Sequence, residues 1–203
     1  MGYLLIIVGL ISLMSGIVIL KKDKSKVEKL VQTSLGTSTP KNSKEQQFEI
    51  NKAKGDAFEK FIVRKFDKSF FTIQEWRSDK SVDGVYAISN HFPDLEVKFE
   101  NQEENIVDRF AIECKWRQQF YNGTIRWAED YQVRNYKDYQ IKLGIPVFVT
   151  IGVGGLPTAP NELYIIPLNF LESNTVSKDE LQPFKRILME EKFYWDEKTK
   201  QLR

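Results

Sequence analysis

Residues 109–116 read RFAIECKW, an apolar run that closes on charged and aromatic residues. Short runs of this kind, bounded by polar residues, are typical of β-strands. Successive side chains of a strand point to opposite faces of a sheet, so Ala111, Glu113 and Lys115 share one face. The residues between them share the other face. An acidic and a basic side chain are therefore predicted to project together from one strand.

Helices and further strands are predicted on both sides of this run. Upstream, residues 48–66 carry apolar residues at helical spacing, which predicts an amphipathic helix over one face of a sheet. Downstream, Gly144 closes a predicted helix over residues 125–144, and the apolar residues 145–155 predict a strand buried on both faces. The remaining predictions are strands at residues 70–76, 84–89, 93–99 and 163–168, a helix at 178–191 and an edge strand at 193–203. This order of elements indicates an α/β fold.

The N-terminal residues 3–20 read YLLIIVGLISLMSGIVIL and carry no charge. As a helix they would extend about 27 Å, close to the thickness of a bilayer core. A cleaved signal peptide would have positive charge before the apolar run and a small-residue cleavage site after it, and neither is present. A cleaved signal and a buried core helix nevertheless stay open as alternatives to a transmembrane helix.

The residues after the apolar run set the expected orientation and domain boundaries. The segment KKDKSK at residues 21–26 places four lysines there, so the positive-inside rule predicts a single-pass protein whose C-terminal domain lies in the cytoplasm. Residues 1–20 are the predicted transmembrane anchor, residues 21–47 a basic juxtamembrane segment and flexible linker, and residues 48–203 the α/β domain.

The composition limits which kinds of metal and catalytic site the chain can form. The chain is 41% apolar and 13% aromatic, which is too rich for a disordered protein. Cys114 is the only cysteine and His91 the only histidine, which excludes an intramolecular disulfide, a cysteine-based zinc cluster and a site of several histidines. A metal would therefore need oxygen ligands. Residues 1–47 hold seven of the 30 basic and three of the 28 acidic residues, so residues 48–203 hold 23 basic and 25 acidic residues. Overall charge thus gives no attraction for nucleic acid.

The pair Glu113 and Lys115 suits hydrolysis of a phosphodiester, because a carboxylate can bind a divalent ion while an ammonium orients water or offsets negative charge. A second carboxylate would complete a hard oxygen site of the kind that magnesium prefers. The spacing alone does not decide, since Glu-x-Lys recurs at Glu96 and at Glu190. Context favours Glu113: an apolar strand entry, a helix downstream, and the pair Pro-Asp ending at Asp94, nineteen residues upstream.

These motifs resemble the PD-(D/E)xK nuclease superfamily, which includes restriction endonucleases, Mrr-like enzymes, Holliday-junction resolvases and RecB-type nucleases. The resemblance covers residues 54–168. It implies a restriction-endonuclease-like core, with a central mixed sheet of four to five strands flanked by helices. It also implies that Asp94, Glu113 and the Cys114 main-chain carbonyl bind Mg²⁺ or Mn²⁺, that Lys115 is the catalytic lysine, and that the substrate is DNA rather than RNA.

Further site residues follow from the same resemblance. The run GDAFEKF is similar to the family's leading helix, from which Glu59 would add a supporting carboxylate. Gln132 and Tyr136 are similar to the Gln-x-x-x-Tyr element of RecB-type nucleases, which would place Gln132 in the catalytic site. One alternative stays open: Asp83 in place of Asp94 as the first acid, paired with Glu96 and Lys98.

A local patch is the expected nucleic-acid contact. Basic residues alternate with aromatic ones after the central strand, and such a patch can hold phosphates and stack on unpaired bases. The predicted contacts are Arg117, Arg126, Arg134, Lys137 and Tyr136, among the rings of Trp116, Phe120, Tyr121, Trp127 and Tyr131. The sequence therefore predicts a membrane-tethered, metal-dependent nuclease. The alternatives are a non-catalytic module that binds nucleic acid or protein at the membrane, and a plain scaffold.

Overall fold

The computed structural model describes residues 43–77, 81–82, 85–86 and 91–203. The chain divides into two compact units, Met1–Gln47 and Phe48–Arg203, and the central sheet belongs to the second unit. The predicted anchor at residues 3–20 and the alternative acid Asp83 lie outside the described residues. Among the described residues, no helix has both the length and the apolar character needed to cross a membrane.

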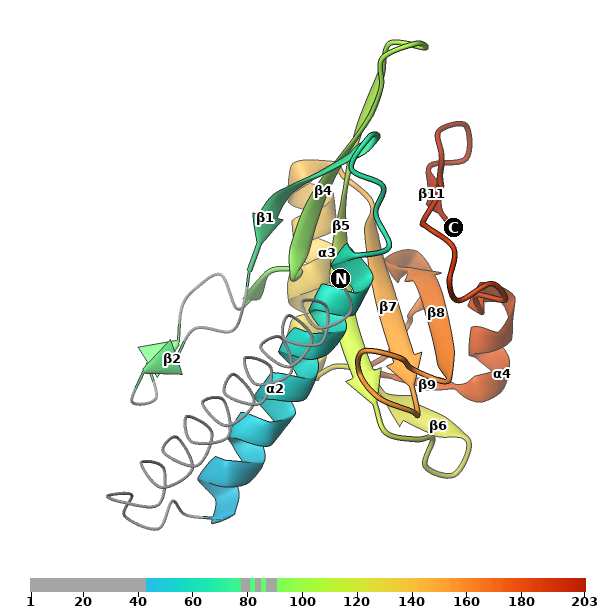
Figure 1. Ribbon diagram of the computed structural model, residues 1–203. Helices are drawn as coiled ribbons and strands as arrows, with labels where there is room; N and C mark the ends of the chain where they lie inside the picture. Colours follow the sequence, from blue (N-terminus) through green and yellow to red (C-terminus); the bar gives the residue numbers. More distant parts are fainter. Residues whose placement is uncertain (1–42, 78–80, 83–84, 87–90) are drawn as a thin grey trace, which may run out of the picture. The chain divides into compact units, whose positions relative to one another are not determined.

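A five-stranded mixed sheet forms the centre of the second unit, as Figure 1 shows. Its strands, in spatial order, are β1 (Phe71–Trp76), β4 (Leu95–Asn101), β5 (Ile106–Arg117), β7 (Val147–Val153) and β8 (Glu162–Pro167). The pair β5 and β7 is parallel, and the other neighbours are antiparallel. The predicted α/β class and mixed sheet are confirmed, with the strand that contains Glu113 at the centre.

Two helices cover opposite faces of this sheet (Figure 1). Helix α2 (Ser43–Val63) buries Phe58 against a cluster that includes Ile112, while α3 (Asp130–Leu143) buries Tyr136 against a cluster that includes Ala111. The predicted alternation of strand β5 is therefore confirmed. Helix α2 begins at Ser43, so it includes the last residues of the segment predicted as a linker.

Strand β7 is buried along its whole length, as its run of apolar and β-branched residues predicts. Gly152 lies where α2 comes closest to the sheet. A Cβ atom added there would be 2.4 Å from Cε2 of Phe58, so the absence of a side chain allows the ring to pack directly on the strand. Glycine at this position thus sets how near α2, with its Glu59, lies to the sheet.

Two predicted helices differ from the structure. The helix expected over residues 125–144 begins only at Asp130, because Thr124–Arg126 forms strand β6 and pairs with β9 (Thr175–Ser177). It ends as predicted, with Gly144 in the left-handed region at φ 64°.

The predicted helix over residues 178–191 is wrong beyond its first turn. Only α4 (Lys178–Leu181) and the 3₁₀ turn η3 (Gln182–Phe184) form. Pro183 lacks an N–H group, and Arg186 then donates its N–H to the Leu163 carbonyl at 2.8 Å, which ties the chain to β8. The other short elements are β2 (Ser81–Val82), β3 (Val85–Tyr86), η2 (Leu168–Phe170), β10 (Trp195–Asp196) and β11 (Gln201–Leu202).

Candidate active site

A cavity of about 570 Å³ is lined by residues of α2, of α3, of the segment before β4 and of the C-terminal half of β5. The structure brings most of the predicted site residues together here. Those that line it are Glu59, Asp94, Glu113, Cys114, Lys115, Arg117, Arg126, Gln132 and Tyr136. The alternation of β5 and the two covering helices thus direct side chains from distant parts of the sequence to one place.

Asp94 is fixed at the point where strand β4 begins. Its Oδ2 accepts the N–H of Cys114 at 2.7 Å. The side-chain carboxylate thus continues the hydrogen bonding between β4 and β5 beyond the last paired residues, Leu95 and Ile112. Arg77 holds the same segment from the end of β1: its N–H donates to the Asp94 carbonyl at 2.7 Å and its Nη1 to the Pro93 carbonyl at 3.1 Å. Sequence reasoning did not identify Arg77, because its contacts with the Asp94 segment are to main-chain carbonyls, which no side-chain motif reveals.

The main-chain carbonyl of Cys114 faces the same side of β5 as Asp94. In a strand, the N–H and C=O of one residue point to the same neighbour, and successive residues alternate. The Cys114 N–H points to Asp94, whereas the Glu113 carbonyl accepts a hydrogen bond from Thr150 of β7 at 3.2 Å. The Cys114 thiol is buried, and its pKa is raised well above the ordinary value by burial and then by the charge of Asp94.

Glu113 is almost completely buried, at 1% exposure, and its two oxygens differ. Its Oε1 accepts the hydroxyl of Tyr136 at 2.7 Å and contacts the ammonium of Lys115. Its Oε2 is buried and has no hydrogen-bond partner within the part of the chain that the structure describes. An unsatisfied buried acceptor costs about 1–3 kcal/mol, and more when it is charged, so an orphan of this kind points to an ion or water at that oxygen.

The electrostatics of Asp94 and Glu113 also favour a bound cation. Burial, and after it the charge of Glu113, raises the pKa of the Asp94 carboxyl well above its ordinary value, although the Lys115 charge opposes this. Burial lowers the pKa of the Lys115 ammonium, but the charges of Glu113 and Asp94 outweigh it and leave that pKa above its ordinary value. The ammonium of Lys115 thus offsets the charge of two neighbouring carboxylates, and a bound cation would offset the remaining negative charge.

The donor set fits a hard divalent ion. Within the described residues, no three side chains of His, Cys, Asp or Glu converge to hold a metal ion by themselves. Magnesium commonly takes one or two carboxylates and keeps several waters. Asp94, Glu113 and the Cys114 carbonyl offer oxygen ligands of that kind, and the three residues line the same cavity.

Glu59 and Gln132 line the cavity in different roles. Glu59 is 8% exposed, and its Oε2 accepts the indole N–H of Trp76 at 2.8 Å. Sequence analysis missed Trp76, whose place on the neighbouring strand β1 no local pattern reveals. Gln132 uses its Oε1 to accept the N–H of Glu129 at 2.9 Å, in a reciprocal cap at the start of α3. Gln132 therefore caps the start of α3, the helix that carries Tyr136.

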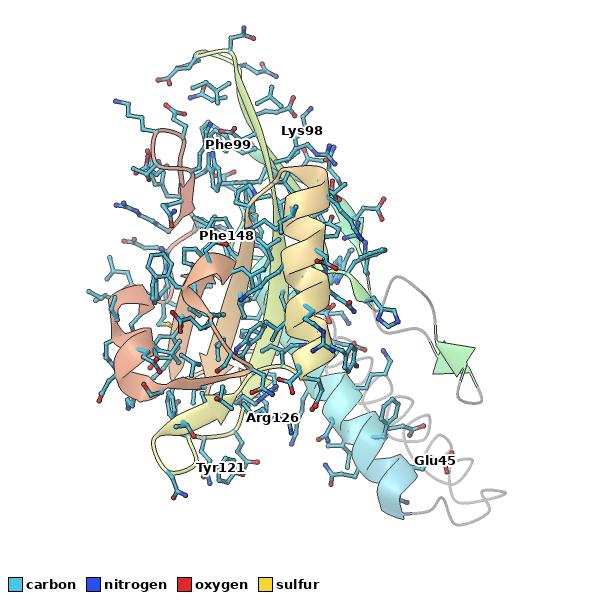
Figure 2. The ribbon with its side chains drawn as sticks, turned by 180° about the vertical axis from the view of Figure 1, so that it is seen from behind. Glu45, Lys98, Phe99, Tyr121, Arg126 and Phe148 are labelled. Carbon is cyan, nitrogen blue, oxygen red and sulfur yellow. The ribbon has the colours of Figure 1, made fainter. Side chains whose placement is uncertain are left out.

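The predicted nucleic-acid contacts are only partly gathered. Figure 2 shows Arg126 and Tyr121 near the end of the domain where α3 begins, and both line the cavity. Arg117 also lines it, but its guanidinium donates to the carbonyls of Trp116, Arg126 and Trp127 and is mainly a brace for the β6 segment. Arg134 and Lys137 are described and are not among the lining residues.

Two further residues change the expected list. The ring of Tyr136 is 1% exposed, so it cannot stack on a base; this corrects its predicted place among the nucleic-acid contacts. Lys54, which sequence analysis did not single out, lines the cavity with its ammonium 5.5 Å from the centre of the Trp116 ring. Its position on the cavity side of α2 follows from the helical spacing with Phe58.

Comparisons with known proteins give little beyond this geometry. No protein-family model matches the chain. No curated protein matches it either. Among solved structures, it is similar to Hjc, a Holliday junction resolvase from the archaeal hyperthermophile Archaeoglobus fulgidus, with 18% sequence identity and a TM-score of 0.42. That match covers 64% of this chain and 93% of Hjc. A likeness this distant assigns no activity, so the functional conclusion depends on the site itself.

Proposed function

We propose that this chain is a metal-dependent nuclease with a restriction-endonuclease-like core, which hydrolyses phosphodiester bonds at the cavity lined by α2, α3 and the C-terminal half of β5. The observation that carries the proposal is the buried Glu113 Oε2, which has no partner among the described residues and lies in a cavity that Asp94 also lines. Mg²⁺ or Mn²⁺ is the ion that this oxygen set would take.

The chain's own residues have distinct parts in this reaction. Asp94, Glu113 and the Cys114 carbonyl would hold the ion, and Tyr136 would keep the Glu113 carboxylate in place through Oε1. A bound ion would polarise the phosphate and lower the pKa of the attacking water. Lys115, kept charged by its two carboxylate neighbours, would hold a phosphate oxygen or stabilise the charge that develops on it.

The cavity also offers positive charge for a phosphate backbone. Its basic lining residues are Lys52, Lys54, Arg77, Lys115, Arg117 and Arg126, against the acidic Asp56, Glu59, Asp94 and Glu113. This local excess supports a nucleic-acid substrate even though residues 48–203 as a whole carry slightly more acidic than basic side chains. DNA remains favoured over RNA only through the motif resemblance.

The test is a cleavage assay on the full chain with labelled single- and double-stranded DNA and RNA, with Mg²⁺ or with a chelator. Glu113→Gln should abolish ion-dependent cleavage while the protein stays folded. Glu190→Gln is the matched control, since Glu190 is exposed and belongs to another Glu-x-Lys pair. Cleavage by Glu113→Gln at the wild-type rate would remove the assignment. Nucleic-acid binding without cleavage by the wild type would favour the non-catalytic module.

We also propose that residues 3–20 anchor the enzyme in a membrane with its catalytic domain on the cytoplasmic side. The support is the uncharged run and the lysines that follow it. An anchored nuclease would act only on nucleic acid that reaches the membrane surface.

A further inference from the structure

A second cavity, of about 450 Å³, adjoins the candidate active site. Arg77 and Phe92 line both cavities, so the two share a wall. The other residues that line the second cavity are His91, Glu96, Asn135, Asp138, Tyr139, Lys142 and Leu143. Its volume lies within the range of small-molecule sites, about 300–1,000 Å³.

The chemistry of this cavity suits a flat aromatic ligand with a polar edge. Phe92 is 39% exposed and packs against Tyr139, with ring centroids 5.6 Å apart. The Arg77 guanidinium lies 5.8 Å from the Phe92 centroid and 5.7 Å from the Tyr139 centroid. Arg77 is held in place by Glu96, whose Oε2 accepts from Nη2 at 3.2 Å. The exposed Phe92 ring, supported from behind by Tyr139 and flanked by the Arg77 guanidinium, is a surface of the kind that stacks on bases.

Hydrogen-bonding groups on α3 and beside Phe92 border this surface. Asn135 and Asp138 lie on α3, and the Asn135 amide is 3.0 Å from Nδ1 of His91. Amide, carboxylate and imidazole groups can pair with the donors and acceptors at the edge of a base. The side chain of Lys142 adds a positive charge that a phosphate can contact.

We infer that the second cavity binds an unpaired nucleobase of the strand whose phosphate lies at the active site. The inference rests on the proposed nuclease function and narrows its substrate to nucleic acid with an unpaired nucleotide beside the point of cleavage. Phe92 precedes Asp94 by two residues, a backbone span of at most about 7 Å. Successive phosphates of a helical strand rise about 3.4 Å, so one or two nucleotides cover that separation. A base inside a duplex is stacked and paired and cannot enter.

Binding measured in chelator, where cleavage is blocked, tests this directly. The probes are a fluorescein-labelled single-stranded DNA, the same strand in a duplex, and a duplex with a short unpaired gap. Phe92→Ala should weaken binding of the single strand and the gapped duplex by roughly 5- to 150-fold, the usual effect of losing one stacking ring. Binding of the intact duplex should not change. Phe92→Tyr, which keeps a ring, should bind like the wild type.

Phe70→Ala is the matched control, because Phe70 is 45% exposed, contacts another ring at 6.3 Å and does not line either cavity. Equal effects of Phe92→Ala and Phe70→Ala would overturn the inference. The wild type gives a second readout that needs no variant: 2-aminopurine in the gap should change its fluorescence on binding, and 2-aminopurine inside the intact duplex should not. The same signal from both would also overturn it.

The two proposals fail in distinguishable ways. If the wild type cleaves nucleic acid with Mg²⁺ but Phe92→Ala binds every probe normally, the base site is wrong and the nuclease stands. If single-strand binding depends on Phe92 but no substrate is cleaved, the base site stands and the hydrolase does not. Binding of the wild type to none of the probes would overturn the base site regardless of the cleavage result.

Discussion

Two buried tyrosines on α3 hold two buried glutamates. Tyr136 donates to Glu113 at 2.7 Å, and Tyr139 donates to Glu96 at 2.8 Å. Both bonds join a hydroxyl to a carboxylate, and Glu96 is further held by Arg77 and Arg109, which with Tyr139 lower its pKa although burial opposes them. Only Glu113 has an oxygen without a partner in the described part of the chain. Both oxygens of Glu96 are therefore satisfied by protein groups, whereas Glu113 keeps one oxygen available for the proposed ion.

Replacing each tyrosine by phenylalanine separates these roles. Tyr136→Phe and Tyr139→Phe should each reduce the free energy of unfolding by about 1.5–3 kcal/mol, the usual value for a hydrogen bond to a charged group. Only Tyr136→Phe should weaken divalent-ion affinity, because it frees the Glu113 carboxylate to rotate. Urea unfolding and ion titration measure the two quantities. Equal ion affinity in both variants would show that Tyr136 does not position the Glu113 carboxylate for ion binding.

At the scale of elements, the contact between α2 and β7 sets the distance from Glu59 to the sheet. Gly152→Ala should lower the free energy of unfolding by about 1–3 kcal/mol, because its methyl group would overlap the Phe58 ring. Gly55→Ala is the paired variant within α2: nothing lies within 4 Å of a Cβ there, and it should raise stability by about 0.5–1 kcal/mol. Urea unfolding of both variants checks the prediction, and a neutral Gly152→Ala would contradict the close packing.

Strand β8 is tied to the α4 region through Glu162. Burial favours the neutral acid, but hydrogen bonds from Lys185 and Tyr164 and the nearby lysine charges lower the pKa of Glu162 below its ordinary 4.5. A lowered pKa means that this stabilisation is present above pH 4.5 and is lost as the pH falls through the lowered value. The stability difference between the wild type and Glu162→Gln should therefore shrink on acidification in urea unfolding. A stability difference that stays constant as the pH falls would contradict the prediction.

The same elements show what the sequence could predict and what it could not. Alternation in β5 and the apolar run of β7 placed Glu113, Lys115 and the buried strand correctly, because both patterns depend only on neighbouring residues. Helical spacing could not tell that Tyr136 is buried, because that depends on how α3 packs on the sheet. Strand alternation could not tell that Arg117 binds carbonyls, because those carbonyls belong to residues that follow β5 in another segment. Pro183 is a local signal for the early end of α4, but the bond from Arg186 to β8 and the support of Asp94 by Arg77 are contacts between distant segments, which no local pattern encodes.

For the whole molecule, the proposed anchor and catalytic domain make separate claims. The full chain should sediment with membranes and resist extraction at alkaline pH, because transfer of its uncharged N-terminal run to water is unfavourable. A variant with Gly9→Lys and Ile11→Lys should be released, since charge at the centre of a span costs about 2.5–3.5 kcal/mol per residue. Membrane fractionation and immunoblotting measure this. A wild type found wholly in the soluble fraction would contradict the anchor and leave the nuclease proposal untouched.

The central claim is that Asp94 and Glu113 form one divalent-ion site that serves phosphodiester hydrolysis. Mn²⁺ titration of the full chain, followed by electron paramagnetic resonance of the free ion, tests it most directly. The wild type and Glu190→Gln should bind Mn²⁺ saturably at one strong site, and Glu113→Gln should lose that site. Equal Mn²⁺ binding by the wild type and Glu113→Gln would contradict the account.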